Sequence, residues 1–142
     1  MNSLPIYAHE TLYLHGTLAN VFGHRSGYLR IEWHTVPMVS AEVRQLFDEI
    51  LHVLCQQQLH RLFTERTVAP PLHAVDCQWV TQQWLPQARR EAGLSHFAVV
   101  ESNIQVAARA LHPIGESGAA GPVQFRFFDS FAQAQVWIRE AA

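Results

Sequence analysis

The stretch from Trp79 to Val100 constrains the fold of this chain more than any other. It carries two tryptophans at helical spacing, then Gly93, and then an apolar run that starts at Phe97. Large aromatic residues at this spacing predict a buried helix, and Gly93 is typical of the left-handed residue that ends one. A short continuous apolar run is typical of a strand that is buried on both faces of a sheet. The stretch therefore predicts a helix-to-strand crossover of an α/β protein.

The composition indicates one globular domain. The chain has 142 residues, of which 49% are apolar and 15% charged, which is enough apolar material for a core and too little charge for disorder. We expect a single domain over residues 1–142, with its core from about residue 10 onward. The net charge of -2 gives no electrostatic footprint for nucleic acid or for an anionic membrane.

The basic residues exclude two kinds of chemistry. All ten are arginine, and the sequence contains no lysine. A Schiff-base enzyme needs a lysine amine as its nucleophile, and a phosphate-binding loop of the G-x4-G-K-[ST] type needs its lysine. Arginine does not deprotonate in proteins and therefore replaces lysine in neither.

Nothing in the sequence predicts export or membrane insertion. The first residues lack a basic segment followed by an apolar core, and no apolar run approaches the ~20 residues that span a bilayer. Cys55 and Cys77 do not form a C-x-x-C pair, and we expect both thiols to be reduced. We therefore expect a cytoplasmic protein without a membrane span.

The pattern of apolar residues and breakers predicts early strands followed by alternating helices and strands. Ser40 is expected to cap a long amphipathic helix, Asp76 to cap the helix that carries the tryptophans, and Pro86 to kink or divide that helix near residues 84–85. Short crossovers between the later strands require parallel, right-handed connections, whereas the early strands pair as antiparallel hairpins. The fold class is therefore α/β, with a mixed, mostly parallel sheet, antiparallel N-terminal hairpin strands and about four packed helices. We expect strands at 11–14, 18–22, 28–33, 61–67, 97–101 and 124–128, and helices from 40 to about 58, from 76 to 93, around 104–111 and after 130.

Five segments carry a family resemblance. They are Tyr28-Leu29-Arg30-Ile31-Glu32-Trp33, the strand 61–67, Trp79-x4-Trp84-x-Pro86, Gly93-Leu94-x-x-Phe97-Ala98-Val99-Val100 and Phe128-Asp129-Ser130-x-x-x-Ala134-x-x-Trp137-Ile138. Together they resemble a bacterial group of small single-domain proteins that are similar to the STAS domain (sulfate transporter and anti-sigma-factor antagonist). The resemblance covers roughly residues 10–142 and consists of core positions, so it implies a fold more than an activity.

The resemblance implies a regulatory or binding domain and not an enzyme. In the anti-sigma antagonists of this family, a serine or threonine in the loop after a central strand is phosphorylated, at the start of a helix. The corresponding loop here is 64–68. The Asp-Ser-x-Gly pattern of the family is missing from it, and Thr64 and Thr67 are the nearest hydroxyl groups.

Candidate binding residues gather where the strand at 61–67 is expected to end. In open α/β sheets, ligands sit beyond the carboxyl ends of the strands. We expect a non-enzymatic regulatory module that acts through protein–protein contact at residues 64–79, with an edge of the N-terminal hairpin available for homodimerisation. The residues expected to bind the partner or a ligand are Thr64, Glu65, Thr67, His73, Asp76 and Trp79.

An alternative function is that of a carrier for a small apolar or lipid-like ligand. The ligand would lie between helices and sheet, among Trp79, Trp84, Phe97 and Leu111. Aromatic residues at helical spacing also serve as ordinary core, which is the interpretation we favour for Trp84. The sequence leaves this alternative open.

A third alternative is a hydrolase-like enzyme. It would use His73 with Glu65 or Asp76 for acid–base chemistry, but no nucleophile or cofactor motif accompanies these residues. We expect no cofactor. The nine histidines do not support a metal site, because His52 and His60, for example, would lie about 12 Å apart on a helix, too far to share an ion.

Overall fold

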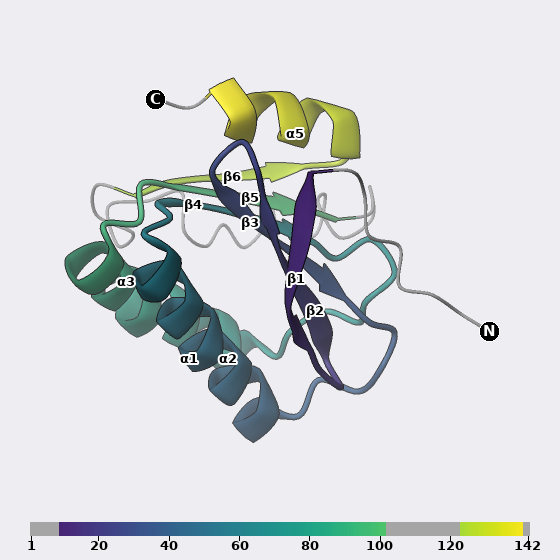
Figure 1. Cartoon of the computed structure of the whole chain (residues 1–142). Helices are drawn as coiled ribbons and strands as arrows, with labels where there is room; N and C mark the ends of the chain where they lie inside the picture. Colours follow the sequence, from purple (N-terminus) through teal and green to yellow (C-terminus); the bar gives the residue numbers. More distant parts are fainter. Residues whose placement is uncertain (1–8, 102–122, 141–142) are drawn as a thin grey trace.

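The computed structural model describes residues 9–101 and 123–140. Its strands are β1 (Glu10–His15), β2 (Ala19–His24), β3 (Tyr28–Trp33), β4 (Arg61–Glu65), β5 (His96–Val100) and β6 (Gln124–Phe128), and its helices are α1 (Ser40–Gln57), α2 (Ala74–Trp79), the π-helix η1 (Val80–Trp84), α3 (Leu85–Ala92) and α5 (Phe131–Glu140). The strands form one sheet in the order β1-β2-β3-β4-β5-β6. The first three are antiparallel to one another, and β3 to β6 are parallel. Figure 1 shows α1, α2 and α3 on one side of the sheet and α5 on the other.

This architecture confirms the predicted α/β class with a mixed sheet and antiparallel N-terminal strands. The strands predicted at 28–33 and 124–128 have these bounds in the structure, whereas the strand predicted at 61–67 ends at Glu65. The described residues contain α1, the continuous run α2–η1–α3 and α5, and the helix predicted around 104–111 lies outside them. No helix within 9–101 and 123–140 is long and apolar enough to cross a membrane.

Helix α1 follows from the spacing of its apolar residues. Buried side chains recur every three or four residues, so they form one stripe along the helix. Val39 precedes the first turn, and Gln58 ends the helix in a left-handed conformation with φ 55°. Ser40, predicted as the cap, is instead the first helical residue. The buried stripe consists of Val43, Leu46, Phe47, Ile50, Leu51 and Leu54.

The helix that ends at Gly93 contains a wide turn next to Pro86, where the sequence predicts a kink or a division. The N–H of Leu85 donates to the carbonyl oxygen of Val80, which closes a π-helical turn. A proline has no N–H, and in a regular helix its ring clashes with the carbonyl group four residues earlier. The wide turn in η1 accommodates Pro86 at the start of α3. Gly93 then ends α3 with φ 72°, as predicted.

Asp76 does not cap α2, and this prediction was wrong. The helix begins at Ala74 after His73, so Asp76 lies inside the first turn. Its carboxylate is fully buried, accepts a hydrogen bond from Ser40 Oγ at 2.7 Å and lies 3.3 Å from Nε of Arg44. Asp76 therefore joins the start of α2 to the start of α1 instead of satisfying the N–H groups of its own helix.

The two faces of the sheet are covered differently, and we call them the α1 face and the α5 face. Successive side chains of a strand point to opposite faces. On the α1 face, the larger core packs under α1, η1 and α3, and the fully buried Trp84 donates from Nε1 to the carbonyl oxygen of Phe47 at 2.8 Å. On the α5 face, a smaller cluster consists of Tyr28, Phe63, Ala98, Val100, Ala134 and Ile138.

A buried arginine lies on the α5 face of β3. The side chain of Arg30 is 1% exposed, and its guanidinium donates two hydrogen bonds to Glu10, from Nε at 2.7 Å and from Nη2 at 2.9 Å. Carboxylate oxygens of Glu32 and Glu65 lie 3.3 Å and 3.5 Å from Nη1, and the guanidinium lies 4.3 Å from the centre of the Phe22 ring. Because removing an ion from water costs several kcal/mol, Arg30 depends on these carboxylates.

Replacing Arg30 by methionine tests this ion cluster. We expect Arg30→Met to lower the free energy of unfolding at neutral pH by about 3–5 kcal/mol, because the buried Glu10 carboxylate loses the guanidinium that it pairs with. The loss decreases as the pH falls towards about 4, where carboxylates take up protons. Urea unfolding at several pH values measures both effects, with Arg90→Met, at an exposed position of α3, as the control. A large loss that is independent of pH would contradict this account.

Candidate functional site

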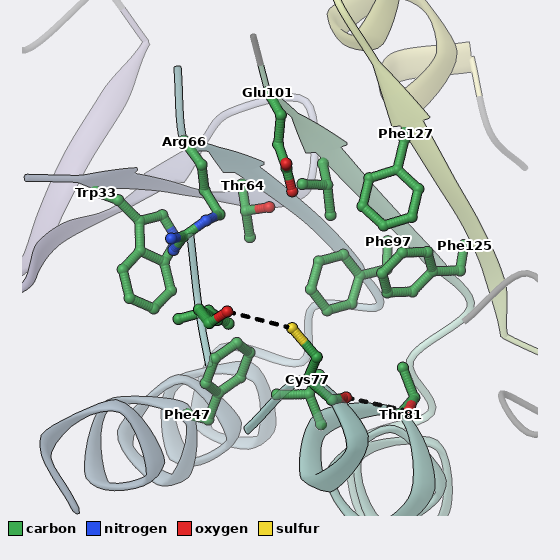
Figure 2. Close-up of a pocket in the computed structure, with 13 residues that line it drawn as sticks. Trp33, Phe47, Thr64, Arg66, Cys77, Thr81, Phe97, Glu101, Phe125 and Phe127 are labelled. Carbon is green, nitrogen blue, oxygen red and sulfur yellow. Dashed lines mark hydrogen bonds between the residues drawn. The ribbon is translucent and has the colours of Figure 1, made fainter. Parts of the chain in front are cut away.

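A cavity lies on the α1 face at the carboxyl ends of the parallel strands, and we call it the strand-end cavity (Figure 2). Residues of β3 to β6 form one side, and α2 and η1 form the other. The space open to the centre of a water molecule is ≈ 50 Å³. That is room for roughly three or four waters or a short organic chain. The lining consists of Trp33, Phe47, Thr64, Arg66, Leu72, Cys77, Val80, Thr81, Phe97, Val99, Glu101, Phe125 and Phe127.

Five aromatic rings contribute to the wall. The ring centres of Phe97 and Phe125 are 4.8 Å apart, and those of Phe125 and Phe127 are 5.1 Å apart. Trp33 and Phe47 form a second pair, with ring centres 5.9 Å apart. Figure 2 shows the two groups on either side of the cavity. A wall of this kind suits an apolar ligand, since apolar and aromatic side chains dominate small-molecule sites.

Polar groups lie where β3, β4 and β5 end, at the upper side of the cavity in Figure 2. Thr64 Oγ1 donates to the carbonyl oxygen of Ala98 at 3.2 Å. Arg66 and Glu101 are 4% and 2% exposed, so two buried charges of opposite sign line this side. The guanidinium carbon of Arg66 lies 4.4 Å from the centre of the Trp33 ring. The Nε1–H of Trp33 is buried and has no acceptor in the described part of the chain.

The helical side of the cavity comes from the wide turn and the helix before it. Val80 and Thr81 belong to η1, and Cys77 belongs to α2. Thr81 Oγ1 donates to the carbonyl oxygen of Cys77 at 3.1 Å, and Cys77 Sγ lies 4.0 Å from the carbonyl oxygen of Leu72. Single π-helical turns occur frequently at functional sites. The position of η1 therefore supports the choice of this cavity as the candidate site.

The predicted site residues of β4 and its following loop are divided between the two faces. Thr64 lines the strand-end cavity, whereas Glu65 points to the α5 face and pairs with Arg30. Thr67 is exposed and lies with Glu65 in a hollow at the ends of β3 and β4. The division follows from the alternation of side chains along a strand. Neighbours in sequence are therefore not neighbours in this site.

The other three predicted residues lie around α2. His73 is exposed and precedes the helix, and Asp76 is buried in the contact with α1. Trp79 is half-buried and packs edge-on against Phe47, with ring centres 6.2 Å apart. His73 and Asp76 lie with α2 over the α1 face, and Glu65 lies on the opposite face. His73 and Glu65 are therefore apart, and the Asp76 carboxylate contacts Ser40 and Arg44.

The residues predicted to hold an apolar ligand have separate positions. Phe97 lines the cavity, and Trp84 lies in the core beside it, with the two ring centres 6.2 Å apart. Trp79 is absent from the described lining. Leu111 lies outside the described residues.

Sequence reasoning missed both buried charges of the cavity. Arg66 lies two residues after Thr64, and Glu101 lies two residues after Val99, so each follows a lining residue on the same face of the sheet. The two-residue period of a strand would have predicted that Arg66 and Glu101 lie on the same face as Thr64 and Val99. Phe125 and Phe127 follow the same rule on β6, where the alternation was visible in the sequence.

Comparison of the chain with protein-family models, with curated proteins and with solved structures gave no match. The resemblance to STAS-like proteins therefore stays a prediction, and the site is argued from its geometry. Within the residues that the structure describes, no group of three or more histidine, cysteine, aspartate or glutamate side chains is placed to hold a metal ion.

Glu65 is the predicted site residue with a shifted pKa. Burial raises the pKa of its carboxyl group above the ordinary value of 4.5. Arg30 opposes this shift, while Glu32 and Glu10 add to it through repulsion. A carboxyl group with a raised pKa binds its proton more tightly in the folded state than in the unfolded state. The charge on Glu65 at neutral pH therefore lowers the stability of the fold.

This charge is tested by the variant Glu65→Gln. We expect the variant to be slightly more stable than the natural protein at neutral pH, because the neutral amide avoids the cost of burying a charge. The difference shrinks as the pH falls through the raised pKa of Glu65 towards 4.5, since the natural side chain then becomes neutral as well. Urea unfolding over this range measures it, with Glu49→Gln, at an exposed position of α1, as the control. A clear loss of stability at neutral pH would mean that the contact with Arg30 outweighs the burial.

Proposed function

We propose that the protein is a non-enzymatic binding module that holds a small, largely apolar molecule with one polar group in the strand-end cavity. The observation that carries this proposal is the aromatic cavity at the carboxyl ends of β3 to β6. Ligands of open α/β sheets bind at this edge. The proposal corresponds to the carrier alternative from the sequence, with a different set of lining residues.

The chemistry of the lining supports a ligand of this class. Phe97, Phe125 and Phe127 offer apolar surface, while the buried Nε1–H of Trp33 offers a donor that has no acceptor in the described residues. A buried donor without a partner costs about 1–3 kcal/mol, so an oxygen atom of a ligand would gain that interaction. The size of the cavity favours a short chain over a ring system.

Binding is favoured over turnover by the positions of the titratable groups. The described lining contains no histidine, and Cys77 Sγ lies 4.0 Å from the carbonyl oxygen of Leu72. Thr64 and Thr81 already donate their hydroxyl protons to backbone oxygen atoms. This supports a role in holding a molecule unchanged.

A cavity-filling substitution tests the proposal. Val99 is 5% exposed and lines the cavity, so Val99→Phe is expected to fill it, with a loss of stability of about 1–3 kcal/mol from overpacking. We expect butanol or butanoate to produce saturable shifts of the lining methyl groups in NMR spectra of the natural protein and none in Val99→Phe. Val136→Phe, at an exposed position of α5, is the matched control and is expected to behave like the natural protein.

Native mass spectrometry of the purified chain gives an independent measurement. A co-purifying small molecule that is lost in Val99→Phe and kept in Val136→Phe supports the proposal. Two results together would contradict the proposal. One is a chain without a co-purifying molecule, and the other is NMR shifts by the probe that are equal in all three proteins or absent from all three. Urea unfolding shows that each variant is folded before it is compared.

A second candidate function is a regulatory module that acts through protein contact, in line with the resemblance to STAS-like proteins. Val68 and Val75 are 66% and 56% exposed within the segment 64–79. Val39 is also exposed, and the hydrogen bond between Ser40 and Asp76 joins the starts of α1 and α2 next to Val39 and Val75. Exposed apolar side chains favour a partner surface where they form one patch.

This second function predicts that charge at Val68 and Val75 abolishes partner binding. We expect affinity capture with the natural chain to retain a partner that Val68→Asp/Val75→Asp does not retain. Val136→Asp changes a similarly exposed valine on α5 and is expected to retain it. Light scattering on the same three proteins shows whether the partner is a second copy of the chain. Equal retention by all three proteins would contradict this function.

A further inference from the structure

A cleft lies on the α5 face, between the turn that joins β2 to β3 and helix α5, and we call it the α5-face cleft. Its volume is ≈ 430 Å³, several times that of the strand-end cavity by the same measure. Charged and imidazole side chains dominate the lining, in contrast to the aromatic lining of the other site. Those that bear on its chemistry are His9, Glu10, His24, Arg25, Arg30 and Arg139.

A fourth arginine, Arg61, fixes the two walls of the cleft relative to each other. Arg61 donates from Nη1 to the carbonyl oxygen atoms of Ile138 and Arg139, at 2.7 Å and 3.1 Å, and from Nη2 to the carbonyl oxygen of Ser26. Gly27, with φ 96°, leaves the space for this contact, because a Cβ there would lie 2.7 Å from Nη2 of Arg61. The backbones that carry Arg25 and Arg139 are therefore held in a fixed relation across the cleft.

The carboxylate that faces the cleft is already engaged. Both oxygen atoms of Glu10 accept hydrogen bonds from Arg30 at the base of the cleft, and Arg30 also lies within 3.5 Å of carboxylate oxygens of Glu32 and Glu65, which do not line the cleft. Arg25 and Arg139 are exposed at the two walls and supply positive charge beyond this pair. The groups lining the cleft therefore carry more positive than negative charge at neutral pH.

The hydrogen bonds of the two histidines determine which nitrogen of each neutral ring carries the proton. The backbone N–H of Ser26 donates to Nδ1 of His24 at 2.9 Å, and Nη1 of Arg25 donates to Nδ1 of His9 at 3.2 Å. A nitrogen that accepts a hydrogen bond carries no proton, so the proton of each ring is on Nε2. The His24 ring is also held flat against Tyr28, with ring centres 4.6 Å apart.

From these contacts we propose that the α5-face cleft binds a phosphate group, free or in a small phosphate monoester. The lining combines arginine side chains of both walls with two histidines whose Nδ1 atoms already accept hydrogen bonds, while its carboxylate is engaged by Arg30. Charge-assisted hydrogen bonds from arginine are the strongest that proteins make to oxyanions, and guanidinium geometry matches phosphate. The site lies on the other face of the sheet from the strand-end cavity, so it does not rest on the proposed function.

The full chain titrated with inorganic phosphate and with phenyl phosphate tests the proposal. We expect saturable shifts of the His9 and His24 ring resonances in NMR spectra, and a higher pKa of His24 in the bound state because an anion stabilises its charged form. Burial lowers the pKa of His24 in the free protein, so the expected change is upward from a low starting value. Tighter binding of the ester identifies the monoester as the ligand class, and equal binding identifies free phosphate.

Paired substitutions separate a site from general charge attraction. We expect Arg139→Gln to weaken phosphate binding about tenfold or more, since each charge-assisted hydrogen bond contributes that much. Arg90→Gln removes an exposed arginine from α3, on the other face, and is expected to change the affinity little. An equal loss in both variants, or an absence of saturable shifts in the natural protein, would overturn the proposal. We expect acetate to bind more weakly than phosphate. Weaker binding of acetate would exclude a site that accepts any anion.

Discussion

The unequal covering of the two sheet faces determines where the strand-end cavity and the α5-face cleft lie. Helices α1, α2 and α3 lie over the α1 face, whereas α5 lies across β4, β5 and β6 on the other side (Figure 1). The larger apolar core therefore lies on the α1 face. The side chains on the part of the α5 face over β1 to β3 need other stabilising contacts. Arg30 and its three carboxylates occupy that part, because a buried charge is stable only among partners.

Each face then yields a site of its own kind. The α1 face ends in a small aromatic cavity with polar groups at the strand ends, and the α5 face contains a wider cleft with arginine and histidine side chains. β3 contributes to both, through Trp33 on one face and Arg30 on the other. The two sites share one strand but no lining side chain, so either proposal can fail without the other.

Sequence patterns predicted the elements better than the side-chain positions. Periodicity and Gly93 located α1, β3, β6 and the end of α3, because these features act within a few residues. The roles of Ser40 and Asp76 as caps were wrong, since each side chain bonds to the other across 36 residues and tertiary contact replaced local capping. For the site, the sequence predicted the edge of the sheet at which the strand-end cavity lies, with Thr64 in its lining, but it grouped Thr64 with Glu65 although adjacent strand residues face apart.

Pro86 links the local sequence to the shape of the strand-end cavity. Its missing N–H and its ring exclude a regular helical turn, and the wide turn of η1 takes up the extra backbone. This turn carries Val80 and Thr81 into the cavity lining while Trp84 stays in the core. The kink could be predicted from the sequence, but the side chains that it places in the cavity lining could not. They are identified only when the positions of the strands beneath the turn are known. Pro86 would weaken an isolated helix. It fits this helix, which borders a cavity, because the wide turn that accommodates the proline supplies part of the cavity lining.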